Sequence, residues 1–219
     1  MNIAMTCYNR YPYLLRSIKS LFNTEFDKPT ELYLFDDNSE DPKIKKLLES
    51  LGHKENLKVN ITYNKKNIGC DPNMLLSIKT AFNNTDENFV ITTDSDAIYH
   101  PDWYTNLRDR TLEVQEKIAG VSTFNTPAHP TITDYNKHLV EKESLGGFAL
   151  AISKDLFEQI PSNQPSWDWT FTKIAQQQKL KMLCTKDSYA DHIGVHGVHS
   201  TGDDEGDKAQ NFLGEQLDV

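Results

Sequence analysis

The sequence predicts an α/β domain built on a mostly parallel sheet flanked by helices. Two observations lead to this prediction: short apolar runs typical of strands alternate with amphipathic segments of helical periodicity, and polar clusters follow directly after several of the runs. Alternation of this kind is the pattern of βαβ units, in which a helix connects two parallel strands. The 219 residues, with 37% hydrophobic content, suffice for one sizeable domain with a real core.

In the first half we expect four strands with three helices between them. The first helix begins at Pro12, and the other two begin at the Asp-Pro pairs Asp41-Pro42 and Asp71-Pro72. Aspartate is favoured at the N-cap and proline in the first helical turn, so these pairs predict helix starts. The expected strands are residues 2–6, 31–35, 57–63 and 88–93.

The second half is less regular. A helix is predicted over 167–178, because Trp167, Phe171 and Ile174 lie at helical spacing and form an inward face. The tail from Thr201 is acidic and nearly without core residues, so we expect a mobile terminus or a linker to further domains. The other expected elements are a helix at 100–117 and strands at 118–124, 146–153 and 180–184.

Charge and composition exclude several classes of partner and site. A net charge of −9 argues against nucleic acid or an anionic membrane as the main partner. No apolar run approaches the length of a membrane span, and the N-terminus lacks the pattern of a signal peptide. Cys7, Cys70 and Cys184 are far apart and match no zinc spacing, so we expect reduced thiols and a cytoplasmic location.

Three polar clusters follow predicted strands: residues 6–10, 36–39 and 94–96. In open α/β sheets, ligands bind beyond the carboxyl ends of the strands, so these clusters mark the expected binding edge. Asp94 and Asp96 are separated by one serine, and two carboxylates so close repel unless a cation lies between them. A hard divalent ion, Mn²⁺ or Mg²⁺, is the natural partner of such oxygen ligands. The alternative is a solvated turn, since aspartate and serine are common in turns.

Four segments in this order, "TCYNRYPYLLRSIKSL", "LYLFDDNSED", "NKKNIGCDPNMLLSIKTA" and "ITTDSDAIYHPDW", resemble the nucleotide-sugar-dependent glycosyltransferases of the GT-A fold, most closely the family 2 type. The resemblance covers residues 1–110 and, more weakly, 140–200. It implies a Rossmann-like, mostly parallel sheet with a small antiparallel elaboration in the C-terminal half. It also implies one domain over 1–200, with a nucleotide-binding half (1–100), an acceptor and catalytic half (101–200) and the acidic tail 201–219.

For the nucleotide, the resemblance assigns roles to the first two clusters. Thr6 and Tyr8 would lie against a uracil ring, and Asp37 would accept a hydrogen bond from its N3–H, since a carboxylate is an acceptor and N3 a donor. Arg10 would lie near the pyrophosphate, where a fixed positive charge suits phosphate oxygens; the alternative is a solvated surface arginine.

Further residues carry over from the same family pattern. Asn67 and Gly69 match an Asn-x-Gly that helps to form the floor under the nucleotide in this family. The alternative is an ordinary loop before the predicted cap at Asp71. Asp94 would reach the ribose or a metal-bound water, and Asp96 would ligate the metal. A C-terminal histidine would be the third ligand; His192 matches best, with His196 and His199 as alternatives.

The sugar-binding and catalytic residues are carried over from the second half. Gly146 and Gly147 resemble the turn that passes close to the donor sugar and the acceptor, or they form an ordinary turn before a strand. Asp168 aligns with the catalytic base, with Trp167 in place of the family's Glu; the alternative for Asp168 is an N-cap. Trp169 is the candidate stacking platform for a sugar.

The resulting prediction is a metal-dependent glycosyltransferase of the hexosyl type, which transfers a sugar from UDP to a hydroxyl of a glycan or glycoprotein with inversion. Metal and Arg10 would stabilise the charge that grows on the leaving diphosphate. A non-catalytic nucleotide- or carbohydrate-binding module is the alternative from another class. A sugar nucleotidyltransferase is less favoured, because "TCYNRYPY" lacks the glycine-rich loop that such enzymes have after the first strand.

Overall fold

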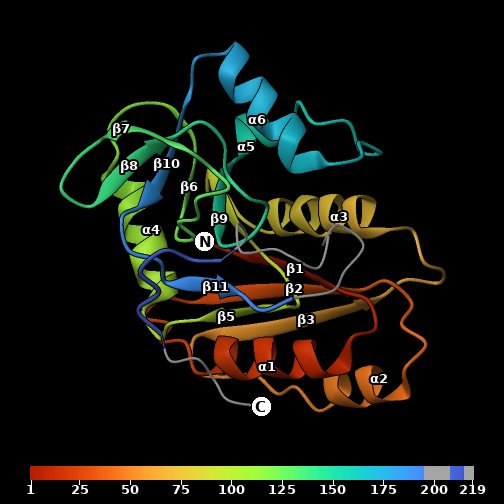
Figure 1. The fold of residues 1–219 in the computed structure, drawn as a ribbon. Helices are drawn as coiled ribbons and strands as arrows, with labels where there is room; N and C mark the ends of the chain where they lie inside the picture. Colours follow the sequence, from red (N-terminus) through yellow and green to blue (C-terminus); the bar gives the residue numbers. More distant parts are fainter. Residues whose placement is uncertain (195–207, 215–219) are drawn as a thin grey trace.

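The computed structural model describes residues 1–194 and 208–214. Its centre is a nine-stranded mixed sheet in the order β3-β2-β1-β4-β9-β6-β10-β8-β7, with helices on both faces (Figure 1). A separate two-stranded sheet joins β11 to β5. The elements in chain order are β1 (Ile3–Cys7), α1 (Tyr11–Phe22), β2 (Thr30–Asp36), α2 (Pro42–Glu49), β3 (Leu57–Tyr63), α3 (Cys70–Asn83), β4 (Phe89–Thr93), β5 (Ala97–Tyr99), α4 (Trp103–Glu113), β6 (Ile118–Ser122), β7 (Thr131–Asp134), β8 (Leu139–Lys142), β9 (Leu150–Ser153), α5 (Lys154–Phe157), α6 (Trp167–Gln177), β10 (Lys181–Thr185) and β11 (Ala190–His192).

The predicted α/β class with its flanked, largely parallel sheet is confirmed. β3, β2, β1 and β4 are all parallel, whereas β9 runs antiparallel to both β4 and β6. The antiparallel elaboration comprises β7 with β8 and β5 with β11. Because β6 is antiparallel to β9, it points the same way as β4, and the loops after β1, β2, β4 and β6 emerge at one edge.

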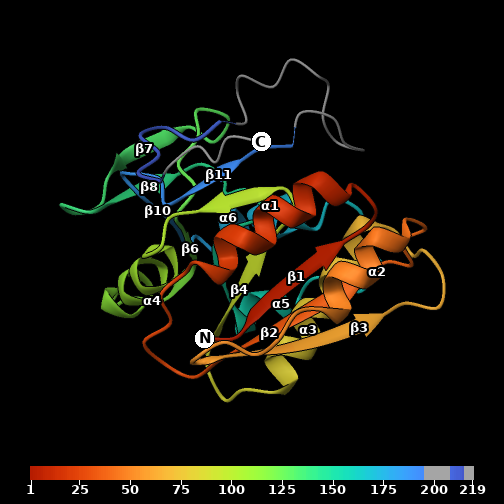
Figure 2. The same cartoon turned by 90° about the horizontal axis from the view of Figure 1, so that it is seen from below.

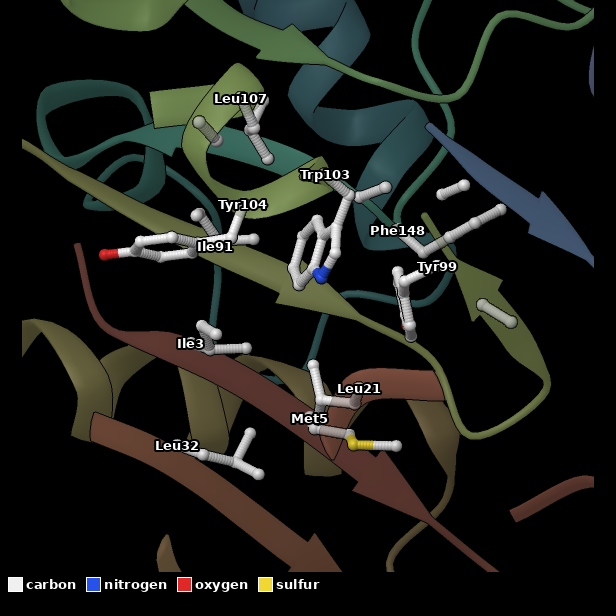
Figure 3. Packing of buried hydrophobic residues seen from close by; sticks show 14 of the residues in the cluster. Ile3, Met5, Leu21, Leu32, Ile91, Tyr99, Trp103, Tyr104, Leu107 and Phe148 are labelled. Atoms are coloured by element: carbon white, nitrogen blue, oxygen red, sulfur yellow. The ribbon is translucent and has the colours of Figure 1, made fainter. Parts of the chain in front are cut away.

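The alternation of side chains along β1 divides the core between the two faces of the sheet. Ile3 and Met5 belong to the cluster that also contains residues of α1, α2 and α4, whereas Ala4 packs with residues of α3 and α6. In Figure 2, α1 and α2 lie over the first of these faces. Trp103 and Tyr104 of α4 are fully buried and pack close to Ile3 in this cluster (Figure 3). Successive strand residues point to opposite faces, so both must be covered for such an apolar strand to be stable.

One of the two Asp-Pro predictions is confirmed and the other is wrong. Asp41 caps α2, and its side chain accepts the N–H of Lys43 at 2.9 Å. Helix α3 instead begins at Cys70, after Gly69, and Asp71 lies within the first turn. Gly69 has φ 94° and ψ 158°, a conformation open essentially to glycine, so the backbone turns into the helix two residues earlier than the Asp-Pro pair predicts.

The sequence did not predict the short elements β5, β7, β8, β11 and α5. The strands have three or four residues and the helix has four. Segments of that length carry too few residues to show a period, so the sequence pattern does not reveal them.

The described part of the C-terminal tail, residues 208–214, is bonded to the domain, which corrects the expected mobile terminus for this stretch. The Gln210 N–H donates to the Asn125 carbonyl, and Phe212 forms a β-bridge with Ser188. Among the residues that the structure describes, no helix is long and apolar enough to cross a membrane.

Candidate active site at the carboxyl edge of the sheet

The three polar clusters meet at one edge because the strands before them are parallel and in register. Cys7 pairs with Asp36 across β1 and β2, and Met5 pairs with Thr93 across β1 and β4. Each strand therefore ends at a similar height, and its polar residues continue from that edge. The expected convergence of residues 6–10, 36–39 and 94–96 is thus a consequence of strand register.

The loop between β1 and α1 has an unusual backbone that the next loop supports. Asn9 and Arg10 both have left-handed conformations, with φ of 50° and 55°. For non-glycine residues such conformations cost on the order of 1–3 kcal/mol each and persist only when the surroundings impose them. Here the Asn9 N–H donates to Ser39 Oγ at 2.7 Å, and Asn9 Oδ1 accepts the N–H groups of Glu40 and Asp41 at 2.9 and 3.2 Å. These contacts fix the position of Arg10.

Asp37 is 2% exposed and binds the loop between β3 and α3. Its Oδ1 accepts the Asn64 amide at 2.8 Å and the Ile68 N–H at 2.9 Å, and its Oδ2 accepts the Gly69 N–H at 2.8 Å. Asn67 Oδ1 also accepts the Gly69 N–H, at 3.1 Å. A carboxylate offers about four acceptor positions. Asp37 therefore holds the loop with most of its capacity, a role that sequence reasoning missed.

Asp96 lies in a buried ionic cluster. Its Oδ2 is 2.7 Å from Arg10 Nη1 and 3.4 Å from His192 Nε2. Burial by itself would raise the pKa of Asp96, but the hydrogen bond and charge of His192 and the charge of Arg10 outweigh it and hold the pKa below its usual range. The sequence suggested two repelling aspartates that need a cation, and Arg10 supplies a positive charge from within the protein.

His192 reaches Asp96 through the pairing of two short strands. β11 runs antiparallel to β5 with His192 opposite Ala97, and the Ile193 N–H donates to the Asp96 carbonyl at 2.8 Å. This places His192 beside Asp96, as the predicted metal site requires. The alternatives His196 and His199 lie outside the described residues.

Asp96 and His192 together fit the ligand preferences of Mn²⁺ or Mg²⁺ in part. A carboxylate and an imidazole are suitable ligands for such ions, and Mg²⁺ is often held by one or two protein carboxylates with substrate phosphates completing the shell. Within the described ranges no group of three or more His, Cys, Asp or Glu side chains gathers around one point. Asp94 is half-buried nearby, and its carbonyl accepts the Ser17 and Tyr99 hydroxyls at 3.0 and 3.3 Å.

The Gly146-Gly147 turn is hydrogen-bonded to β4, the strand that ends directly before Asp94. The Thr92 hydroxyl, on β4, donates to the Gly147 carbonyl at 2.7 Å. A methyl group on Gly147 would lie 3.5 Å from Asp168 Cβ, so Asp168 lies directly against this turn. The predicted base thus sits beside the predicted sugar-binding glycine.

His129 lies on the other side of this turn and was not among the predicted residues. A methyl group on Gly146 would be 3.2 Å from His129 Nε2, while His129 Nδ1 is 2.7 Å from Ser144 Oγ. No local motif marks His129, because its position depends on how the loop after β6 folds back on the turn.

The start of α6 separates the two neighbouring tryptophans. Trp167 is 5% exposed, as predicted for a core residue, whereas Trp169 is 54% exposed. The N-cap is Ser166, so Asp168 is not the cap; it lies in the first turn and accepts the Trp169 N–H at 2.8 Å. Asp71 accepts the Trp167 N–H at 3.4 Å and so links α3 to α6.

Acidic groups concentrate around Cys70 at the start of α3. Cys70 is exposed at the surface, but desolvation of its sulfur by the surrounding protein and the charges of Asp94, Asp71, Asp96 and Asp168, in decreasing order, raise the pKa of the thiol to about 12. The carboxylates of Asp94, Asp96 and Asp168 therefore share one region with the N-terminus of α3. Of the remaining predicted residues, Thr6 is buried and Tyr8 is 40% exposed at the end of β1.

Residues 2–177 match the family model described as "Glycosyl transferase family 2". The chain belongs to glycosyl transferase family 2. The match covers most of the chain, including the parallel half of the sheet and all three polar clusters. No curated protein matches the chain.

Solved structures with the same fold include complexes with bound nucleotides. TarS of S. aureus (residues 1-349) in complex with UDP-GlcNAc is 17% identical with a TM-score of 0.63, covering 90% of this chain and 59% of TarS. The same protein in complex with UDP is 16% identical with a TM-score of 0.60, covering 86% and 59%. The mannosyltransferase PcManGT from Pyrobaculum calidifontis, in complex with GDP-Man and Mn²⁺, is 18% identical with a TM-score of 0.59, covering 83% and 53%. This family 2 chain thus spans a little over half the length of these solved chains, and the likeness establishes the fold.

Proposed function

We propose that this family 2 chain is a metal-dependent glycosyltransferase that transfers a sugar from a UDP-sugar to a hydroxyl acceptor with inversion. The observation that carries the proposal is the convergence of Arg10, Asp96 and His192 at the edge where Asp37 and the Gly147–Asp168 contact also lie. A cation-binding pair, a fixed guanidinium and a carboxylate beside a small-residue turn are the groups that such a transfer needs.

In this proposal the diphosphate of the donor nucleotide binds beside the Arg10 guanidinium, at the N-terminus of α1. α1 has 12 residues and no acidic side chain in its first turn, and the side chain of its N-cap residue, Arg10, caps none of its N–H groups. The N-terminal N–H groups of a helix and its dipole favour an anion. Thr6, Tyr8, Asn67 and Gly69 would surround the uracil. Asp37 would accept the uracil N3–H with the acceptor capacity that its three protein donors leave over.

The chemical step in this proposal uses Asp168 as general base. Its carboxylate takes the proton from the acceptor hydroxyl while that oxygen forms a bond to the anomeric carbon, and the bond from that carbon to the UDP oxygen breaks. Attack opposite the leaving group inverts the anomeric centre. Trp169, exposed beside Asp168, would stack on a sugar ring, and the Gly146-Gly147 turn, which packs against His129 and Trp167, would lie close to that ring.

Asp96 and His192 would hold Mn²⁺ or Mg²⁺, with Asp94 oriented toward the ribose or a metal-bound water. When bound, the ion would neutralise negative charge that develops on the leaving diphosphate. PcManGT, whose structure contains GDP-Man and Mn²⁺, supports the choice of metal. The UDP and UDP-GlcNAc complexes of TarS support the choice of uracil, and a hexosyl donor is proposed on the same basis.

The first experiment is a thermal-shift panel of UDP, GDP and ADP with and without Mn²⁺. A ligand at 100 times its dissociation constant adds about 2.7 kcal/mol of apparent stability. We expect the largest shift with UDP and Mn²⁺ together. Equal shifts for the three nucleotides would contradict the uracil assignment.

The second experiment measures UDP release from UDP-sugars in the presence of hydroxyl acceptors. Asp168→Asn should lower turnover at least about 100-fold, the lower end for loss of a general base. UDP affinity and melting temperature should stay near those of the unmodified protein, because Asp168 does not cap α6. Release of UDP no faster than in a protein-free control would favour a non-catalytic binding module, and near-normal turnover of Asp168→Asn would exclude it as the base.

A further inference from the structure

The carboxylate that would ligate the metal is already engaged by cationic or hydrogen-bonding side chains. Asp96 Oδ2 receives Arg10 Nη1 at 2.7 Å, with His192 Nε2 at 3.4 Å. The backbone at Gly194 closes this side, since a methyl group there would collide with Asp96 Oδ2 and come within 2.9 Å of Arg10 Nη2. A cation that approaches Asp96 Oδ2 therefore meets the Arg10 guanidinium.

The backbone of Arg10 is held in place, whereas its guanidinium has few hydrogen-bond acceptors. Its guanidinium lies over the ring of Tyr13, 4.5 Å from the ring centre, and its backbone is held in a left-handed conformation by the next loop. Within the described part of the chain, its buried Nε and Nη2 have no hydrogen-bond partner. A guanidinium has five N–H donors, so Arg10 can gain several hydrogen bonds by meeting phosphate oxygens.

Two positive charges on one carboxylate oxygen repel each other, and Arg10 cannot relieve this by losing its proton, because an arginine stays charged in proteins. A divalent ion can therefore bind well at Asp96 only if Arg10 leaves or if new negative charge arrives. A nucleoside diphosphate provides that charge and also provides acceptors for Arg10.

We propose that Arg10 is an exchangeable counter-ion that couples metal binding to nucleotide binding. In the free protein Arg10 neutralises Asp96 and suppresses binding of a divalent ion. When a nucleoside diphosphate binds, Arg10 shifts its hydrogen bonds to the phosphate oxygens and releases Asp96 Oδ2 to the metal. This inference rests on the proposed function of the site and adds an order to it: the metal binds tightly only together with the nucleotide.

The coupling predicts a reciprocal effect of the two ligands. If UDP raises the affinity for Mn²⁺ by some factor, Mn²⁺ must raise the affinity for UDP by the same factor. In a protein whose Asp96 was simply open, most Mn²⁺ affinity would be present without UDP. The difference between these two cases is measurable without any sugar acceptor.

The test is a titration of the protein with Mn²⁺ in the presence and absence of UDP. Electron paramagnetic resonance measures the concentration of free Mn²⁺ at each step and so gives the Mn²⁺ affinity. In the unmodified protein UDP should tighten Mn²⁺ binding at least tenfold. Arg10→Met should bind Mn²⁺ at least tenfold tighter than the unmodified protein in the absence of UDP, and addition of UDP should then tighten it less. Arg10→Lys keeps the charge and should bind Mn²⁺ weakly without UDP, so it reports on the charge even if Arg10→Met folds poorly.

Lys58→Met is the matched control, because it also removes one positive charge from an ion pair. Lys58 Nζ is 3.1 Å from Glu31 Oε2, and this exposed pair lies near the amino ends of β2 and β3, away from the candidate site. It should leave both affinities unchanged. Two results would overturn the exchange: tight Mn²⁺ binding by the unmodified protein without UDP, or a Mn²⁺ affinity of Arg10→Met no higher than that of the unmodified protein. If UDP release is normal in that case, the proposed transferase function still stands. Absence of Mn²⁺ binding in every state overturns the exchange and the metal dependence together, and loss of UDP release with the coupling preserved overturns only the transferase.

Discussion

Replacement of Asp37 by asparagine separates the structural role of this residue from its proposed role in base recognition. The two carboxylate oxygens serve different donors: Oδ1 binds Asn64 and Ile68, and Oδ2 binds Gly69. An asparagine has one acceptor oxygen. In the more favourable of its two amide orientations this oxygen takes the place of Oδ1 and keeps the hydrogen bonds from Asn64 and Ile68. Its NH₂ group then faces the Gly69 N–H, which retains only Asn67 Oδ1 at 3.1 Å.

The substitution therefore removes one charge-assisted hydrogen bond, the one from Gly69, and turns the two bonds from Asn64 and Ile68 into bonds to a neutral oxygen. A hydrogen bond to a charged group contributes about 1.5–3 kcal/mol, so Asp37→Asn should lower the free energy of unfolding by about 2 kcal/mol. Urea denaturation measures this directly, with UDP affinity determined by calorimetry under conditions where the variant is folded. If Asp37 also accepts the uracil N3–H, UDP binding should weaken by about 1.5–3 kcal/mol in addition.

Asp41→Asn is the control, because it is the same chemical change at an aspartate that accepts one backbone N–H as the cap of α2. Asparagine caps a helix about as well as aspartate, so its unfolding free energy should change by less than about 0.5 kcal/mol. An unfolding free energy of Asp37→Asn equal to that of the control would refute the argument from the two oxygens.

Three further outcomes follow from burial and charge. Trp167→Ala should lose about 3–5 kcal/mol of stability in urea denaturation, because the side chain is buried, whereas the exposed Trp169→Ala should keep its stability and raise the KM for the sugar substrates; equal stability losses would contradict this. Gly120→Ala should destabilise the fold by at least about 1–3 kcal/mol, since its methyl group would lie 2.5 Å from the Ala151 carbonyl oxygen. Gly52→Ala, with nothing within 4 Å, should be neutral or slightly stabilising by the same measurement. Alkylation of Cys70 at pH 8 should be far slower than that of a cysteine peptide, because its pKa of about 12 leaves little thiolate; its rate should still rise tenfold per pH unit at pH 10, where the rate for a peptide has levelled off.

The sequence alone was sufficient to predict the class of the fold and the edge of the sheet that carries the candidate site. The strands before Asp36 and Asp94 are apolar runs of ordinary length, and parallel strands place their following residues at one edge whatever the details of packing. The cap at Asp41 and the buried face of α6 are likewise local, because they depend on contacts within one helical turn or one helical period. The local order of residues determines such features, so the sequence predicts them without the tertiary structure.

The tertiary structure decided which side chains meet. The identical-looking pair Asp71-Pro72 does not start its helix, because Asp37 binds the loop before it and Gly69 turns the backbone earlier. Arg10 and His192 reach Asp96 from opposite ends of the chain, one through a left-handed loop and one through the pairing of two three-residue strands. Contacts between residues so distant in sequence arise only when the whole sheet has formed, and neither periodicity nor local propensity records them.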